Sequence, residues 1–125
     1  MAKITQEMKD LIAKVRICIA ATADQNGLPN ASYKGSLQIL DDEHLIFADF
    51  NSLKTRKNLE ENKQICILVA DPANRLGYQF KGDVELLTEG EIYDKLADLY
   101  AKRAPKAPRP KYVVKVNVKE IYEAK

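Results

Sequence analysis

The residues best suited to chemistry lie in one short run of hydroxyl and cationic side chains. Residues 51–58 read NSLKTRKN and come directly after a predicted strand, at the start of a predicted helix. The first turn of a helix offers backbone N–H groups without partners and the positive end of the helix dipole, and both favour an anion. Ser52 and Thr55 add hydroxyl donors, and Lys54 adds an ammonium group. This pattern predicts a phosphate-binding site.

The positive charges of this helix stand at its unfavourable end. Cations normally favour the last turn of a helix, but Lys54, Arg56 and Lys57 occupy the first turns. A bound anion would explain that placement. The alternative is a solvated basic face on which Glu60 and Glu61 pair with Arg56 and Lys57.

A second set of polar side chains follows one face of a predicted strand over residues 30–39. Polar and apolar residues alternate there with a period of two, which is typical of a strand. The apolar phase holds Tyr33, Gly35, Leu37 and Ile39, and the polar phase holds Asn30, Ser32, Lys34, Ser36 and Gln38. Pairing with a strand over residues 45–50 would bring Ser32 and Lys34 to the same anion. The alternative is an ordinary solvent-facing strand surface, with Tyr33 in the core or in an interface.

Other chemistries find little support. The single histidine, His44, lies in a predicted hairpin turn without a supporting motif. Cys18 and Cys66 each sit within an apolar run and lack CxxC spacing, so both are predicted to be reduced, buried small hydrophobes. One histidine and two cysteines do not build an ordinary zinc site, so no metal site is expected. Neither a GxGxxG nor a GxxxxGK[ST] motif is present, and no catalytic residue is assigned.

The elements that must position these residues alternate between strands and short helices. Thr5 is a predicted N-cap for a helix to about residue 14, and Thr88 with Glu91 has the pattern of a capping box for the last helix. Gly82 predicts a bulge in a long strand. Residues 104–110 carry three prolines and are expected to be extended. Strands are predicted over residues 15–22, 30–39, 45–50, 64–70, 76–86 and 112–122, and a middle helix over residues 53–61.

This order predicts a mainly β fold with short helices, a six-stranded antiparallel sheet closed or nearly closed into a barrel. The 125 residues, of which 46% are hydrophobic and 30% charged, fit a single domain over residues 1–125. The net charge of +2 is too small to indicate a nucleic-acid or membrane partner. The first residues contain no apolar stretch typical of a signal peptide, so a cytoplasmic location is expected.

At these residues the chain resembles the pyridoxamine 5′-phosphate oxidase-like FMN-binding split barrels. Residues 52–62 (SLKTRKNLEEN), followed by the strand ICILV at 65–69, look like the central motif of that family. The preceding pattern also fits, with a glycine-containing turn, a start at Pro29 and Asn30, a long strand and a hairpin. The similarity covers residues 5–120, and the chain length is most similar to the small FMN-binding proteins of the family.

The resemblance implies a six-stranded split barrel and a homodimer with FMN at the subunit interface. Ser32, Tyr33, Lys34 and Gly35 would line the phosphate and ribityl part of the cofactor. Ala48, Asp49 and Phe50 would lie along the isoalloxazine edge, and Ser52, Lys54 and Thr55 would hold the phosphate. The last predicted strand lacks the arginine and histidine of the family's C-terminal substrate motif, so oxidation of vitamin B6 phosphates is not expected.

The resemblance implies a flavoprotein, either a flavin or nitro-type reductase or an electron-transfer protein. One alternative is a heme-binding or deazaflavin-binding protein on the same fold. Another is a small-barrel module that binds nucleic acid without catalysis. That module would need exposed aromatic residues among the basic ones, whereas Tyr78, Phe80 and Tyr112 lie on the apolar phases of their strands.

Overall fold

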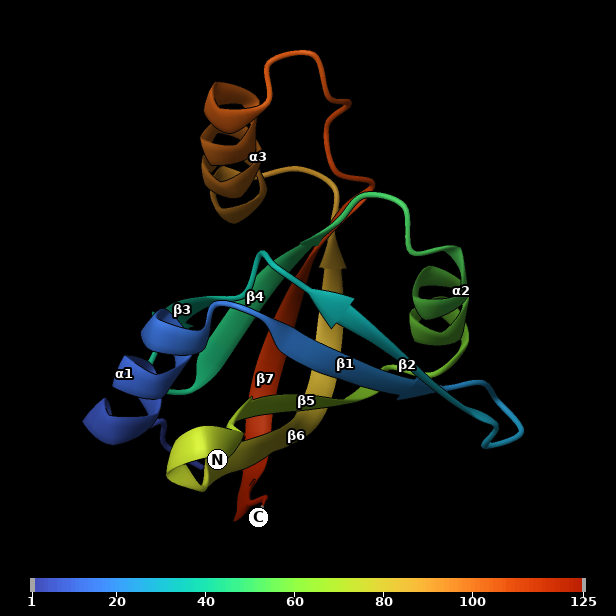
Figure 1. Cartoon of the computed structure of the whole chain (residues 1–125). Coiled ribbons are helices and arrows are strands. Elements are labelled where there is room, and N and C mark those ends of the chain that lie inside the picture. Colours follow the sequence, from blue (N-terminus) through green and yellow to red (C-terminus); the bar gives the residue numbers. More distant parts are fainter. Residues whose placement is uncertain (1, 125) are drawn as a thin grey trace.

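A computed structural model describes residues 2–124, in which one antiparallel sheet is flanked by three α-helices (Figure 1). The helices are α1 (Gln6–Val15), α2 (Leu53–Glu61) and α3 (Glu91–Arg103), and a short 3-10 turn, η1, spans Pro72–Asn74. The strands are β1 (Cys18–Ala23), β2 (Pro29–Lys34), β3 (Gln38–Asp41), β4 (His44–Asp49), β5 (Gln64–Asp71), β6 (Leu76–Leu87) and β7 (Tyr112–Glu123).

The sheet is a curled barrel that stays open along one seam. Its strand order is β2-β1-β5-β6-β7-β4-β3, and every pairing is antiparallel. The two edge strands, β2 and β3, follow each other in the chain but do not pair. The predicted antiparallel split barrel is therefore confirmed, and the split lies at the β2–β3 connection.

The structure has seven strands where the sequence pattern predicts six. The predicted strand over residues 30–39 breaks after Lys34, and residues 35–37 form a bend between β2 and β3. β2 pairs with β1, and β3 pairs with β4 on the other side of the split. One straight strand does not reach two separate edges, so the chain turns at Gly35.

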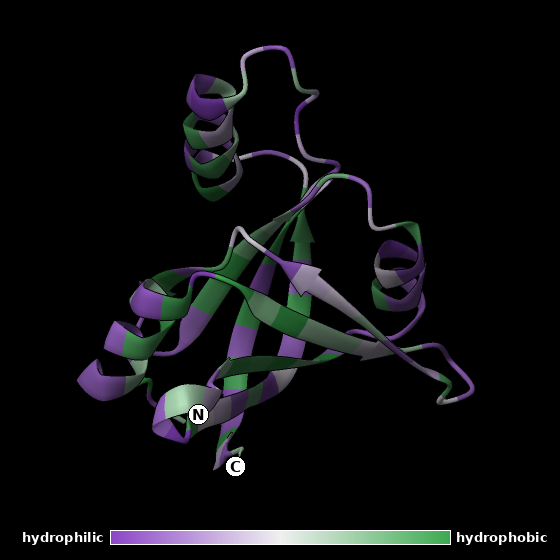
Figure 2. Ribbon diagram, viewed as in Figure 1, coloured by the Kyte–Doolittle hydropathy of each residue, from purple (hydrophilic) through white to green (hydrophobic). Residues whose placement is uncertain are grey.

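The barrel interior is filled by alternate residues of the long strands. Phe47, Ile67, Phe80 and Val116 are fully buried there, and Figure 2 shows apolar residues along the strands and on one side of α1. The pairing of β6 with β7 shifts by one residue between Lys81 and Gly82, so an irregularity is present where Gly82 predicts one, but the extra residue, Lys119, belongs to β7. A Cβ on Gly82 would lie 1.9 Å from the carbonyl oxygen of Asn117, so the bulge requires glycine.

The helix ends agree with the sequence pattern at α1 but not at α3. Thr5 caps α1 and accepts a hydrogen bond from the backbone of Met8. Helix α3 begins at Glu91 after Gly90 and has no side-chain cap, so the predicted capping box of Thr88 and Glu91 is wrong. Gly90 has a φ of 101°, a left-handed conformation that favours glycine and ends the preceding strand region.

Helix α3 covers a second, smaller apolar cluster beside the barrel. Leu96 and Ala97 pack there with Ile46 and Val113. The Tyr93 hydroxyl donates a hydrogen bond of 2.8 Å to the carbonyl of Pro110, which ties the segment after α3 back to that helix. The expectation that residues 104–110 are extended is wrong for residues 105–107, because they form a turn in which the Ala107 N–H donates to the Ala104 carbonyl at 3.0 Å. Among residues 2–124, no helix is both long enough and apolar enough to cross a bilayer.

Candidate functional site

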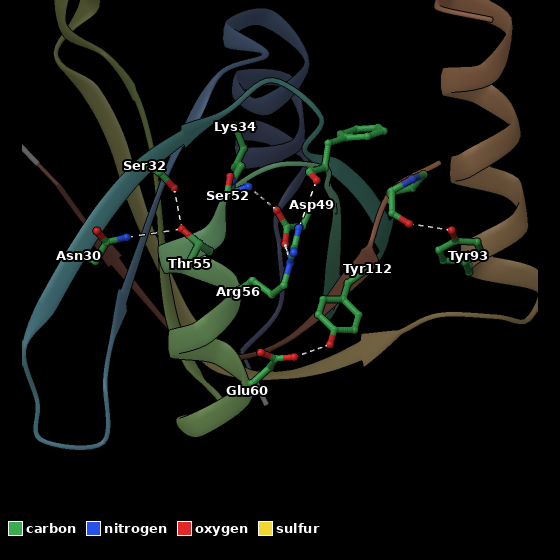
Figure 3. A network of polar contacts seen from close by, with 12 residues as sticks. Asn30, Ser32, Lys34, Asp49, Ser52, Thr55, Arg56, Glu60, Tyr93 and Tyr112 are labelled. Atoms are coloured by element: carbon green, nitrogen blue, oxygen red, sulfur yellow. Dashed lines mark hydrogen bonds and ion pairs between the residues drawn. The ribbon is translucent and has the colours of Figure 1, made fainter. Parts of the chain in front are cut away.

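The polar face of β2 meets the first turn of α2 (Figure 3). The Ser32 and Thr55 hydroxyl oxygens are 2.9 Å apart, and the Asn30 amide donates to Thr55 at 3.5 Å. The Lys34 ammonium donates a hydrogen bond to the Ser52 hydroxyl. The structure therefore brings together hydroxyl and ammonium groups from segments about 20 residues apart in the chain.

The inward face of β2 is the polar one. Lys34 is 7% exposed, whereas Tyr33 is 73% exposed and points away from the barrel. Of the two alternatives for Tyr33, the core is wrong, and a place in an interface stays a prediction. The reason is that β2 is an edge strand whose inner face is covered by α2, and there Ser32 and Lys34 find polar partners.

A buried carboxylate at the end of β4 fixes the start of α2. Asp49 is 1% exposed and accepts hydrogen bonds from the backbone N–H of Ser52 at 3.1 Å and from Nε of Arg56 at 3.2 Å. Arg56 also donates to the carbonyl of Phe50 at 3.2 Å. Glu60 accepts a hydrogen bond from the Tyr112 hydroxyl, and Arg56 pairs with Asp49, so the alternative in which Arg56 pairs with Glu60 is wrong. Arg56 therefore stabilises the start of α2 through these contacts. The cation that β2 directs toward α2 is Lys34.

The N-terminus of α2 differs from those of the other two helices. Its N-cap residue, Ser52, makes no side-chain cap, and the first turn has no acidic residue. Helix α1 has a complete capping box with Glu7 in its first turn, and α3 has acidic residues in its first turn. The exposed Lys54 adds further positive charge at α2. An anion would stabilise this end of the helix through the dipole and the backbone N–H groups.

Lys34 is held in an environment that disfavours its own charge. Burial lowers the pKa of the Lys34 ammonium, and the Asp49 carboxylate opposes part of that decrease. Its ammonium nitrogen also lies 6.0 Å from the centre of the Phe47 ring. An anion beside Lys34 would supply the charge compensation that the protein provides only in part.

An open cleft of about 820 Å³ adjoins this polar junction. Ser36 joins the bend after β2 to strand β4 in the wall of this cleft, because its hydroxyl accepts a hydrogen bond from the Ala48 N–H at 3.0 Å and donates one to the Ala48 carbonyl at 3.2 Å. Asp49 and Thr55 lie behind the wall, and the side chain of Lys54 does not line it. Most of the predicted site residues line the cleft: Ser32, Tyr33, Lys34, Gly35, Ala48, Phe50 and Ser52. Ser36, Asn51 and Tyr100, which were not predicted as site residues, also line it.

Tyr100 is the main cleft residue that the sequence pattern did not indicate. It belongs to the apolar stripe of α3, which predicts a packing role and nothing more. In the structure its ring makes an edge contact with Phe50, with the centroids 5.6 Å apart. No periodicity links α3 to a strand end about 50 residues earlier, so only the fold brings these rings together.

The histidine and the two cysteines lie outside the cleft wall. The Nδ1 atom of His44 is 2.7 Å from a carboxylate oxygen of Asp41 at the β3–β4 turn. Cys18 is buried, and this burial raises the pKa of its thiol to about 11. Within residues 2–124, no three His, Cys, Asp or Glu side chains gather as a metal site would require.

The open seven-stranded barrel, with a polar strand–helix junction at its split, defines a protein of the split β-barrel class. Residues 4–125 match the pyridoxamine 5′-phosphate oxidase family, and the chain belongs to that family. It is 33% identical over 127 residues to the protein MJ0282 of Methanocaldococcus jannaschii, covering 100% of this chain and 83% of that protein. It is 37% identical to HupZ of Group A Streptococcus, with a TM-score of 0.85 over 96% of this chain and 93% of HupZ.

More distant structures share the fold. An FMN-binding protein from Syntrophomonas wolfei is 21% identical, with a TM-score of 0.79 over 94% of this chain and 83% of that one. HutZ, the heme storage protein from Vibrio cholerae, is 16% identical, with a TM-score of 0.72 over 97% and 94% of the two chains. An F420 reductase is 22% identical, with a TM-score of 0.70 over 91% and 94%. The same barrel thus occurs in proteins named for different cofactors.

Proposed function

We propose that this protein binds FMN and acts as an FMN-dependent oxidoreductase of the flavin or nitro-reductase type, or as an electron-transfer protein. The observation that carries this proposal is the meeting of the Ser32, Lys34 and Ser52 side chains in the wall of the 820 Å³ cleft, with the buried Thr55 hydroxyl directly behind Ser32. That arrangement offers an anion site and an adjoining space for a ring system, the two features that a flavin mononucleotide needs. Bound FMN would supply the hydride or electron chemistry.

The residues present fit the cofactor at both ends. At the phosphate end, Lys34 and Lys54 would offer ammonium groups, and Ser32, Ser52 and Thr55 would offer hydroxyls. At the ring end, Phe50 and Tyr100 give an aromatic wall. The Lys34 ammonium is buried, and Asp49 compensates its charge only in part, so burial lowers its pKa. A phosphate beside it would complete the compensation, and this support for FMN does not depend on any relative.

Heme is a weaker fit to this cleft. A heme-binding site supplies a histidine, cysteine, methionine or tyrosine to the iron, and of these only the tyrosines Tyr33 and Tyr100 line the cleft. A deazaflavin has a ring system of similar shape, so the cleft alone does not discriminate it from FMN. Absorbance and mass of the bound chromophore distinguish the three cofactors.

We also propose that the protein is a homodimer with the cofactor at the subunit interface. The outer surface around β1 and β2 exposes large apolar side chains: Ile17 by 54%, Leu28 by 60% and Tyr33 by 73%. Ile19 lies directly between Tyr33 of β2 and Leu68 of β5, so the apolar residues form a continuous row. Because Tyr33 also lines the cleft, a second copy on this face would cover one side of it.

The first experiment is the visible spectrum of the purified protein, with the released chromophore identified by mass. Bands near about 370 and 450 nm from FMN support the proposal, whereas a Soret band indicates heme and a single band near about 420 nm indicates a deazaflavin. A colourless protein that does not take up added FMN would refute it. The dimer is tested by light scattering of wild type and Ile19→Glu. We expect Ile19→Glu to be monomeric with weakened FMN binding, and a monomeric wild type would refute the dimer.

A further inference from the structure

A second cavity, of about 370 Å³, shares two wall residues with the cleft. The shared residues are Gly35 and Tyr100, which line both spaces. A Cβ placed on Gly35 would meet no atom within 4 Å, so the space beside this shared residue is open. We call this second cavity the arginine pocket, after Arg16 and Arg103 in its wall.

The arginine pocket concentrates positive charge without a protein counter-ion. Arg16 comes from the end of α1 and Arg103 from the end of α3, and no aspartate or glutamate lines the pocket. None of the ion pairs found between residues 2 and 124 includes either arginine. Arg103 lies over the Tyr100 ring at 5.4 Å, so its side chain rests on the residue that separates the pocket from the cleft.

Arg16 occupies a backbone conformation that disfavours arginine. It caps the C-terminus of α1 with a φ of 65°, in the left-handed region where glycine is the usual residue. An arginine at such a position is a reason to look for a role of its side chain. The surroundings offer such a role, because Arg16 lines the pocket together with Arg103.

We propose that the arginine pocket binds an anionic group, carboxylate or phosphate, of the small molecule that exchanges electrons with the cofactor in the adjoining cleft. The two guanidinium groups recognise planar or tetrahedral oxyanions through paired N–H donors. The Gln38 side chain in the same wall adds neutral polar capacity. This inference rests on the proposed flavin function, because it places the substrate beside the cofactor cleft.

The test is calorimetric titration of the FMN-loaded protein with inorganic pyrophosphate and, separately, with citrate, at constant ionic strength. Pyrophosphate represents the bridge of a nicotinamide dinucleotide donor, and citrate represents a carboxylate substrate. Arg16→Gly removes one guanidinium and relieves the left-handed strain, so it keeps or raises the unfolding midpoint. Arg103→Gln removes the other guanidinium from the pocket.

Arg75→Gly is the matched control. Arg75 is also exposed and has a φ of 53°, but it lines a different surface beside Leu76 and Ala124. The Arg75→Gly variant therefore removes one positive charge and one left-handed arginine, as Arg16→Gly does, but at a site outside the pocket. We expect Arg16→Gly and Arg103→Gln each to weaken anion binding about tenfold, and Arg75→Gly to change it less than about twofold.

The outcomes separate the two proposals. Tighter binding of pyrophosphate indicates a dinucleotide donor, and tighter binding of citrate indicates a carboxylate substrate. Wild type that binds neither anion, or Arg16→Gly and Arg103→Gln that bind as wild type does, would refute the pocket. If the protein does not take up FMN, the same titrations in a Lys34→Met background test the pocket without the phosphate patch. In that case the missing uptake of FMN refutes the flavin function, and arginine-dependent binding would still support an anion site in the pocket.

Discussion

Replacing Lys34 by methionine makes the apo protein more stable and its binding of FMN weaker. Lys34 is 7% exposed, and the net decrease in the pKa of its ammonium already includes the attraction of Asp49. The folded state therefore disfavours the charge. Methionine has a similar length and carries no charge to desolvate, and Phe47 offers it an apolar neighbour. Asp49 keeps its hydrogen bonds from Ser52 and Arg56.

The magnitudes follow from the two roles of the ammonium. Removing a poorly compensated buried charge stabilises a protein by about 1 to 2 kcal/mol, which for a domain of this size raises the unfolding midpoint by about 4 °C or more. A charge-assisted hydrogen bond to phosphate contributes about 1.5 to 3 kcal/mol, so FMN binding weakens by about 10- to 150-fold. The two effects have opposite signs, which a simple loss of folding does not produce.

The pH dependence gives an independent check on Lys34. Its pKa in the folded protein lies below the ordinary value of 10.5, so the unfolded chain binds more protons between the two values. Stability of the apo protein therefore gains from this group as pH rises through that window, while FMN binding weakens as Lys34 loses its proton. Both trends should be absent in Lys34→Met.

The assays are thermal unfolding without cofactor and FMN titration by quenching of flavin fluorescence. Lys95→Met, which removes an exposed cation from α3, is the control and should change neither quantity beyond about 0.5 kcal/mol. A Lys34→Met protein that binds FMN as wild type does would refute the phosphate role. A lower unfolding midpoint would refute the electrostatic argument.

Three further outcomes test the fold and the site. Thr55→Val loses the hydrogen bonds to Ser32 and Asn30, so we expect the free energy of unfolding in urea to fall by about 1 to 2 kcal/mol. We also expect weaker FMN binding, and an unchanged affinity would show that Thr55 does not bind the phosphate. Gly82→Ala places a Cβ 1.9 Å from a backbone oxygen and should destabilise by more than about 3 kcal/mol, while Gly35→Ala should be tolerated; equal stability of the two would contradict the bulge. Cys18, with its pKa raised to about 11, should react with a disulfide reagent at pH 8.5 about 100-fold more slowly than in urea, and rapid labelling of the native protein would contradict its burial.

Local patterns were sufficient for the elements that depend on neighbouring residues. The expected span of α2 agrees with the structure, because the polar start and the spacing of its buried residues are encoded within one short segment. The N-cap of α1 at Thr5 and the irregularity at Gly82 are predictable for the same reason. The meeting of Ser32 and Lys34 with α2 was also predicted, but from a pairing of residues 30–39 with residues 45–50 that holds only for β3. Ser32 and Lys34 belong to β2, which pairs with β1 and reaches α2 from the other side of the split.

The pattern did not determine which face of β2 points inward. A period of two separates Tyr33 from Lys34 but treats the two faces as equivalent, and hydrophobicity alone favours burial of the tyrosine. The outcome depends on α2, which covers the inner side of this edge strand and offers Ser52 and Thr55 as partners. The same edge explains the break at Gly35, since β2 and β3 belong to opposite sides of the split.

The sequence by itself determined the family and the order of helices and strands apart from the break at Gly35, because these follow from short-range patterns. It also indicated the polar residues of the proposed anion site. Only the tertiary structure decided that Asp49 and Arg56 support the site from behind, and that Tyr100 and Arg103 of α3 reach the cleft and the arginine pocket. The physical reason is that these contacts arise from closing a sheet and docking a helix across it. Such long-range packing depends on the whole chain, and no local spacing of residues records it.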